Sequence, residues 1–233
     1  MAIEVQEINE LIDDSGLKLA IYGMAGSGKT TLSTTTGGST IIISMEGGLL
    51  SIKNPPKNVK GIKLENADQL DELHDFFEGE KICDWLILDS GSEIAEMIFE
   101  DEKEKTDDPR KLYPAFQSRV ISEFKRFRDL QDYNVMITFK MLKIVNQETG
   151  LVTYQIDMPG NKLGPQIPYL FDLVFAIRAE DIEDGEPGEQ YRILQTKKDD
   201  VYTDVKARLP KGITLEMFEE PNLAKIYKKV HAE

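Results

Sequence analysis

The chain of 233 residues, 40% of them hydrophobic, is long enough for one α/β domain with a well-buried core. A formal net charge of −14 argues against broad, sequence-independent attraction to nucleic acid, and no apolar run approaches the length of a membrane span. Cys83 is the only cysteine, which excludes an intrachain disulfide and suits a reducing compartment. We therefore expect a cytoplasmic protein without a membrane partner, folded as a single domain over residues 1–233.

The first predicted element is a buried strand over residues 17–23, which is short, apolar and ends in glycine. Gly23, four further residues and then Gly28-Lys29-Thr30 have the spacing of a phosphate-binding P-loop. Glycines let the backbone bend so that successive N–H groups face one anion, and a helix predicted from about Lys29 adds its N-terminal dipole. Lys29 is predicted to reach the β- and γ-phosphates of ATP, and Thr30 to bind Mg²⁺. The predicted ATP contacts are Gly23, Gly26, Ser27, Gly28, Lys29, Thr30 and Thr31.

The alternative interpretation of this stretch is a glycine-rich turn between a strand and a helix. The apolar strand before it and the helix-forming residues after it favour phosphate binding.

The next two predicted strands, over residues 39–46 and 83–90, end in acidic residues. At the end of the first, Glu46 is placed to orient or deprotonate the water that attacks the γ-phosphate. At the end of the second, Asp89 is placed beside the bound Mg²⁺, through water. The alternatives are a surface glutamate at a strand-to-loop junction and a turn aspartate. A helix is predicted between these strands, over residues 66–77, with Asn66 as its N-cap.

The remaining segments continue the alternation of helix and strand patterns. A helix is predicted over residues 114–130, beginning at Pro114, and basic residues gather in 110–128. His74 and His231 are too far apart in sequence for a histidine metal site and are predicted on the surface. Alternation of this kind predicts a mostly parallel twisted sheet with helices on both faces. The later predicted strands are 133–140, two strands around a turn at 146–150, and strands near 173–179 and 190–196.

The order of these parts resembles the RecA-type ATPase core: a P-loop, then strands that end in Glu46, Asp89 and Lys140. The stretches MPGNKLGPQIPYLFDLVFAI, YRILQTKKDDVYTDVKAR and EEPNLAKIY resemble a narrower group. These are phage-encoded nucleotide-binding proteins built from a RecA core alone, among them ATP-dependent single-strand annealing proteins of phage recombination. The resemblance covers nearly the whole chain.

The resemblance implies further roles. Lys140 stands where RecA proteins carry a γ-phosphate sensor, usually glutamine, that leads into a DNA-binding loop. The hairpin-like segment 141–162 holds the position of that loop, and the residues implied to contact single-stranded DNA are Lys143, Tyr154 and Lys162. From its residues alone, the segment reads equally well as a solvated hairpin.

Two lysines downstream, Lys197 and Lys198, match those that RecA proteins present to the nucleotide of the neighbouring subunit. The implied catalytic residues are therefore Glu46, Lys29, Lys197 and Lys198. Without the resemblance, Lys197 and Lys198 read as a solvated charge pair.

The sequence thus predicts a RecA-fold ATPase with slow turnover. It is expected to form a ring or filament of identical subunits, to bind ATP and Mg²⁺ at subunit contacts, and to promote annealing of single-stranded DNA. A single-stranded DNA-binding protein is a candidate partner, and the host cytoplasm is the expected location if a phage encodes the chain. Two alternatives stay open: a P-loop phosphotransferase acting on a small molecule, and a nucleotide-dependent interaction protein that does not touch DNA.

Overall fold

The computed structural model describes residues 16–45, 49, 52–182 and 188–232. Its strands are β1 (Lys18–Gly23), β2 (Thr40–Ser44), β3 (Val59–Lys63), β4 (Trp85–Asp89), β5 (Asn134–Val145), β6 (Val152–Asp157), β7 (Leu173–Asp181), β8 (Gln190–Gln195), β9 (Lys206–Ala207) and β10 (Phe218–Glu219). Its helices are α2 (Lys29–Leu32), α3 (Gln69–Glu78), α4 (Gly91–Lys105), α5 (Pro109–Arg128), α6 (Leu223–His231) and the 3-10 helix η2 (Gly164–Leu170).

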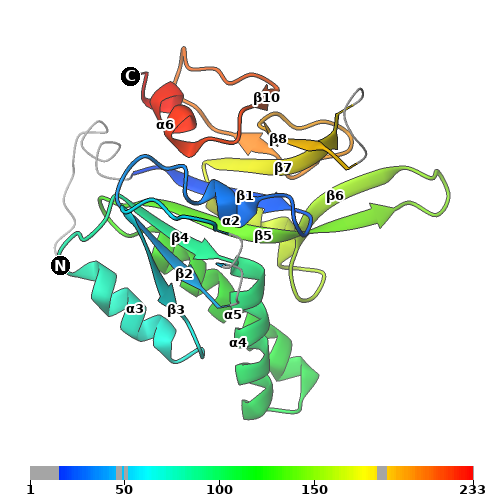
Figure 1. Ribbon diagram of the computed structural model, residues 1–233. Coiled ribbons are helices and arrows are strands. Elements are labelled where there is room, and N and C mark those ends of the chain that lie inside the picture. The colour runs from blue at the N-terminus through cyan, green and yellow to red at the C-terminus, as the bar shows by residue number, and fades with distance from the viewer. Residues whose placement is uncertain (1–15, 46–48, 50–51, 183–187, 233) are drawn as a thin grey trace.

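These strands form one sheet in the order β10-β8-β7-β1-β5-β4-β2-β3, with β6 added to β5 and β9 added to β7 (Figure 1). The run from β7 to β3 is parallel throughout, whereas β6, β8, β9 and β10 pair antiparallel. Every residue of β1, β2 and β4 is buried, as expected for parallel strands covered on both faces. The predicted mostly parallel sheet is confirmed.

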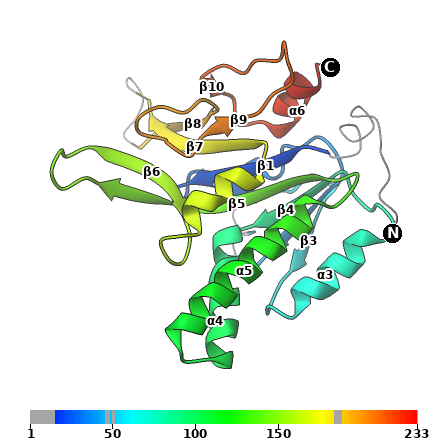
Figure 2. The same ribbon diagram turned by 180° about the vertical axis from the view of Figure 1, so that it is seen from behind.

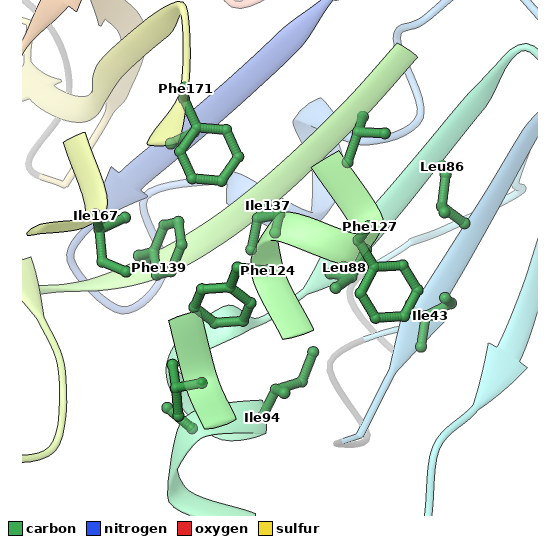
Figure 3. Close-up of a cluster of buried hydrophobic side chains, with 14 of the residues drawn as sticks. Ile43, Leu86, Leu88, Ile94, Phe124, Phe127, Ile137, Phe139, Ile167 and Phe171 are labelled. Carbon is green, nitrogen blue, oxygen red and sulfur yellow. The ribbon is translucent and has the colours of Figure 1, made fainter. Parts of the chain in front are cut away.

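Helices cover both faces of the sheet, with α3, α4 and α5 on one side and α6 on the other (Figure 2). Alternate residues of β1 point to opposite faces: Ala20 and Tyr22 pack with α4 and α5, while Leu19 and Ile21 pack with α2 and α6. Figure 3 shows the larger layer, in which apolar residues of β2, β4 and β5 meet α4 and α5. No helix within the described residues is long and apolar enough to cross a bilayer.

Two predicted helix boundaries differ from the structure. Helix α5 begins at Pro109, not at Pro114, because Asp108 caps it: the Asp108 carboxylate accepts a hydrogen bond of 3.0 Å from the amide of Arg110. An aspartate cap followed by proline at the first helical position is a strong start signal. Helix α3 begins at Gln69, although the side chain of Asn66 does accept a hydrogen bond from the amide of Gln69 (3.2 Å).

Sequence patterns gave no prediction for α4, α6 or β3. Helix α4 ends in the charged run EDEKEK, which hides the apolar face made by Ile94, Ala95 and Ile98. Its start does carry a signal, since Ser90 caps the helix and stands three residues before Glu93. Strand β3 is short, half polar and at the sheet edge.

The prediction that His74 lies on the surface is wrong. Its side chain is fully buried, packs on the ring of Phe127 and lies 2.9 Å from Glu123 through its Nε2 atom. His74 falls on the core-facing side of α3 with Leu70 and Phe77, and Glu123 supplies the polar partner that a buried imidazole needs. Cys83 is buried in the core.

Candidate functional site

The loop between β1 and α2 has the backbone geometry of a tight anion-binding turn. Gly26 and Gly28 have φ values of 75° and 100°, a region that residues with a side chain rarely adopt. A side-chain carbon on Gly23 would come within 2.6 Å of Ile177 and 2.5 Å of the Ser27 hydroxyl. The amides of Gly26 and Gly28 donate to no acceptor among the described residues. Their N–H groups are therefore open to an anion.

Lys29 folds back over this loop. Its Nζ atom donates hydrogen bonds to the carbonyl oxygens of Gly23 (2.7 Å) and Met24 (3.0 Å). Burial lowers the pKa of Lys29; the charge of Asp89 opposes this shift and that of Lys140 adds to it. No carboxylate among the described residues lies within ion-pair distance of Lys29, so its charge remains available to an anionic ligand.

Thr30 and Asp89 are brought together across the sheet. The Thr30 hydroxyl donates to one carboxylate oxygen of Asp89 at 2.6 Å, and the Thr138 hydroxyl donates to the other at 2.6 Å. Strand β5, which carries Thr138, lies between β1 and β4 and so fixes the Asp89 carboxylate in place. A hydroxyl and a buried carboxylate are oxygen ligands of the kind that Mg²⁺ takes beside phosphates. Among the described residues, no three acidic, histidine or cysteine side chains gather as a metal cluster.

A cavity of about 410 Å³ opens in front of the loop, within the usual size of ligand pockets. Four parts of the fold line it: the P-loop with the start of α2, the end of β2, the end of β4 with the start of α4, and the base of the β5–β6 hairpin. The lining residues are Gly23, Met24, Ala25, Lys29, Thr30, Ser44, Asp89, Ser90, Glu93, Lys140, Met141 and Asp157.

The base of the hairpin is tied to α4 at this cavity. Lys140 forms ion pairs with Glu93 and Glu96, the latter at 2.9 Å. Burial acts to lower the pKa of Lys140, but its hydrogen bonds to these two glutamates outweigh burial and raise the pKa above its ordinary value. The Ser92 hydroxyl accepts from the Lys140 amide (3.0 Å) and donates to the Asp157 carbonyl (2.8 Å). Both ends of the hairpin therefore contact the wall of the cavity.

The hairpin predicted within residues 141–162 is present and extends beyond the rest of the sheet (Figure 1). Lys143 is exposed and lies opposite Tyr154 in register, whereas Lys162 is exposed in the segment after β6. The Tyr154 ring stacks on Tyr202 with centroids 5.0 Å apart, and the guanidinium of Arg178 lies 4.7 Å from the Tyr202 ring. One face of the Tyr154 ring is thus covered within the molecule.

The other predicted site residues are more scattered. Lys197 and Lys198 are exposed in the turn after β8, away from any described carboxylate partner. Thr31 is exposed on α2, and the buried Ser27 hydroxyl has no partner among the described residues. Glu46 lies outside the described residues.

The sequence did not predict the positions of two residues at or beside the cavity, Glu93 and Thr138. Glu93 lines the cavity with its side chain 14% exposed, and Thr138 orients Asp89. Glu93 carried a weak signal, because it stands four residues after Asp89 at the start of a helix. Thr138 carried none, because its contact depends on the pairing of β4 with β5.

The fold and this loop define a P-loop nucleotide-binding protein. The chain belongs to the family described as AAA domain, whose model matches residues 15–208. Membership of this family indicates nucleotide binding and, in general, ATP hydrolysis. A comparison with curated proteins returned no match.

Proposed function

We propose that this protein binds ATP with Mg²⁺, hydrolyses it slowly, and uses the nucleotide state to control binding of single-stranded DNA by the β5–β6 hairpin. The observation that carries the proposal is the shared wall of the cavity. Lys140 and Asp157, which pair in register at the base of the hairpin, line the same cavity as Lys29, Thr30 and Asp89. A γ-phosphate in that cavity competes with Glu93 and Glu96 for Lys140 and so biases the hairpin.

Each part of the cavity suits one part of ATP·Mg²⁺. The open loop amides and Lys29 bind the phosphates, and Thr30 with Asp89 holds the metal ion. When bound, Mg²⁺ neutralises negative charge on the phosphate oxygens. In hydrolysis, water attacks the γ-phosphorus and the bond to the β–γ bridging oxygen breaks, which yields ADP and phosphate. Glu46 takes the proton of that water.

The RecA-type resemblance supports a ring or filament of identical subunits. In that arrangement Lys197 and Lys198 stabilise transition-state charge on the nucleotide of the neighbouring subunit. Their exposure in the turn after β8 leaves both side chains free to reach another chain.

The DNA contact must be local because the net charge is −14. Lys143 and Lys162 supply exposed positive charge to the phosphodiester backbone, and the partly exposed Tyr154 ring supplies a stacking surface. The resemblance to phage single-strand annealing proteins makes annealing in phage recombination the proposed outcome, with a single-stranded DNA-binding protein as partner.

A second candidate function rests on the apolar surface of the hairpin. Leu142, Ile144, Val145 and Leu151 are 44%, 39%, 46% and 67% exposed. Exposed apolar residues grouped on one projecting element favour contact with a protein. The same nucleotide switch would then regulate a protein partner in place of DNA.

A titration of labelled single-stranded DNA, with and without ATP and over a range of salt concentrations, tests the proposal. The wild type should bind DNA only with ATP, and Lys143→Ala/Lys162→Ala should weaken binding and lower the salt slope by up to about one unit per lost phosphate contact. The matched control is Lys57→Ala/Lys60→Ala, which removes the same charge from exposed positions at and before β3.

Equal loss of binding in the control would refute a local contact at the hairpin. Absence of DNA binding by the wild type under every nucleotide condition would remove the DNA function and leave the protein-partner function.

A further inference from the structure

An arginine from a distant strand lies against the P-loop. Arg192 belongs to β8, where it is two residues from Leu194, which packs in the core layer with α2 and α6. Alternation along the strand therefore puts the Arg192 side chain on the same face of the sheet as α2. Its Cγ atom lies 3.7 Å from where a side-chain carbon of Gly28 would be, and its Nη2 atom lies 3.5 Å from the carbonyl oxygen of Gly26.

Arg192 also lacks the carboxylate partner that most of the other arginines have. Five arginines form ion pairs with carboxylates: Arg119, Arg126, Arg128, Arg178 and Arg208. Neither Arg110 nor Arg192 has such a pair among the described residues, and Arg110 is exposed on α5.

Arg192 is half-buried. Its guanidinium donates hydrogen bonds to two carbonyl oxygens, those of Gln190 at 3.2 Å and Gly26 at 3.5 Å. A guanidinium has five donors and is best satisfied by a planar pair of anionic oxygens. Two long hydrogen bonds to neutral carbonyls leave most of that capacity unused.

We propose that Arg192 contacts the phosphates of the nucleotide bound by the P-loop, from the β8 side. The inference rests on the proposed nucleotide binding and adds a residue to that site. Loop amides and Lys29 hold the anion from the β1 side, and Arg192 stands beside Gly26 and Gly28, whose N–H groups are open. Charge-assisted bonds from a guanidinium to phosphate oxygens are among the stronger hydrogen bonds. The ligand class is a nucleoside di- or triphosphate.

Calorimetric titration of ATP and ADP into wild type, Arg192→Ala, Arg192→Lys and Arg110→Ala tests this inference. Arg192→Ala should weaken both nucleotides by about tenfold or more, since hydrogen bonds to charged groups contribute that much. The slope of log Kd against log salt should be shallower in Arg192→Ala than in wild type. In Arg192→Lys it should equal the wild-type slope, because lysine keeps the charge. Arg110→Ala, the matched unpaired arginine, should bind like wild type, and thermal melting without nucleotide should be the same in all four proteins.

Wild-type affinity in Arg192→Ala would overturn the inference while leaving the proposed nucleotide binding intact. An equal loss in Arg192→Ala and Arg192→Lys with an unchanged salt slope would also overturn it, since that result assigns Arg192 to support of the loop. If wild type and Arg110→Ala bind no nucleotide, the proposed function itself fails and the inference fails with it.

Discussion

At the scale of single residues, the side chains that line the cavity are already held by hydrogen bonds within the protein. Asp89 receives two hydroxyl hydrogen bonds of 2.6 Å, from Thr30 and Thr138, so the carboxylate has one orientation before any ligand binds. The Lys29 ammonium donates to two carbonyl oxygens of the P-loop, so we expect removal of this side chain to leave the core packing intact. A substitution of Lys29 should therefore impair ligand binding without unfolding the protein.

The first prediction concerns Lys29→Ala. ATP affinity should fall by about tenfold to a hundredfold, because a hydrogen bond to a charged group contributes about 1.5–3 kcal/mol. Thermal melting without nucleotide should stay near that of wild type. Titration calorimetry and melting curves on the same preparations measure both, and unchanged ATP affinity would contradict the P-loop assignment.

The second prediction compares two carboxylates as general bases. Glu46→Gln should keep ATP binding and slow hydrolysis by about 10²–10⁴-fold, because an amide cannot take a proton from water. Glu93→Gln serves as the comparison, since Glu93 lines the cavity but is held by Lys140. Single-turnover rates of ATP hydrolysis distinguish the two residues. Slow hydrolysis by Glu93→Gln together with wild-type hydrolysis by Glu46→Gln would identify Glu93, on α4, as the general base.

The third prediction concerns pH and Lys18. This side chain is buried, donates hydrogen bonds to the carbonyls of Leu130 and Tyr133, and has its pKa lowered by burial from 10.5 to about 8. Between these pH values the unfolded chain binds more protons than the folded one, so this group adds stability as the pH rises. Relative to Lys18→Met, the unfolding free energy of wild type should rise by about 3 kcal/mol between pH 8 and 10.5. Denaturant titrations at three pH values measure it, and a pH-independent difference would contradict the assigned shift.

At the scale of elements, the hairpin is the part that joins the cavity to the surface. At its base, Lys140 pairs with Glu93 and Glu96 of α4, and the Asp157 carbonyl accepts a hydrogen bond from Ser92 at the start of the same helix. The remainder projects from the sheet, with Tyr202 stacked on Tyr154. We therefore expect a change at the base to be transmitted along these two hydrogen-bonded strands.

The fourth prediction follows from this connection. Lys140→Met should still bind ATP through the P-loop, but ATP should no longer increase the affinity for single-stranded DNA, because the side chain shared by the cavity and the hairpin is gone. DNA titrations with and without ATP measure the ratio of affinities. A ratio equal to that of wild type would show that Lys140 does not couple ATP binding to DNA affinity.

At the scale of the whole molecule, we propose that a chain of net charge −14 binds DNA through Lys143 on the projecting hairpin and Lys162 in the segment after it. Much of the fold was predictable because its signals are local: apolar runs gave β1, β4 and β5, and glycine spacing gave the P-loop. Helix α4 was not predicted because its charged end hides a short apolar face. The burial of His74 was not predicted because it depends on a polar partner, Glu123, from another helix. Thr138 contacts Asp89 only through the pairing of β4 with β5, and Arg192 contacts the P-loop only through the packing of β8, so no local pattern encodes either contact. Glu93 carried only a weak local signal.

Hydrogen exchange of the full chain, with and without ATP·Mg²⁺, measures whether nucleotide binding at the P-loop alters the hairpin. Amides that take part in binding or in the coupled rearrangement change their exchange rates, and the two candidate regions are distinct in sequence. With ATP, exchange should slow at residues 23–30 and change simultaneously at 140–157, whereas ADP should affect mainly the loop. Protection confined to the loop with ATP would contradict control of the hairpin by nucleotide, and no protection at either region would contradict nucleotide binding itself.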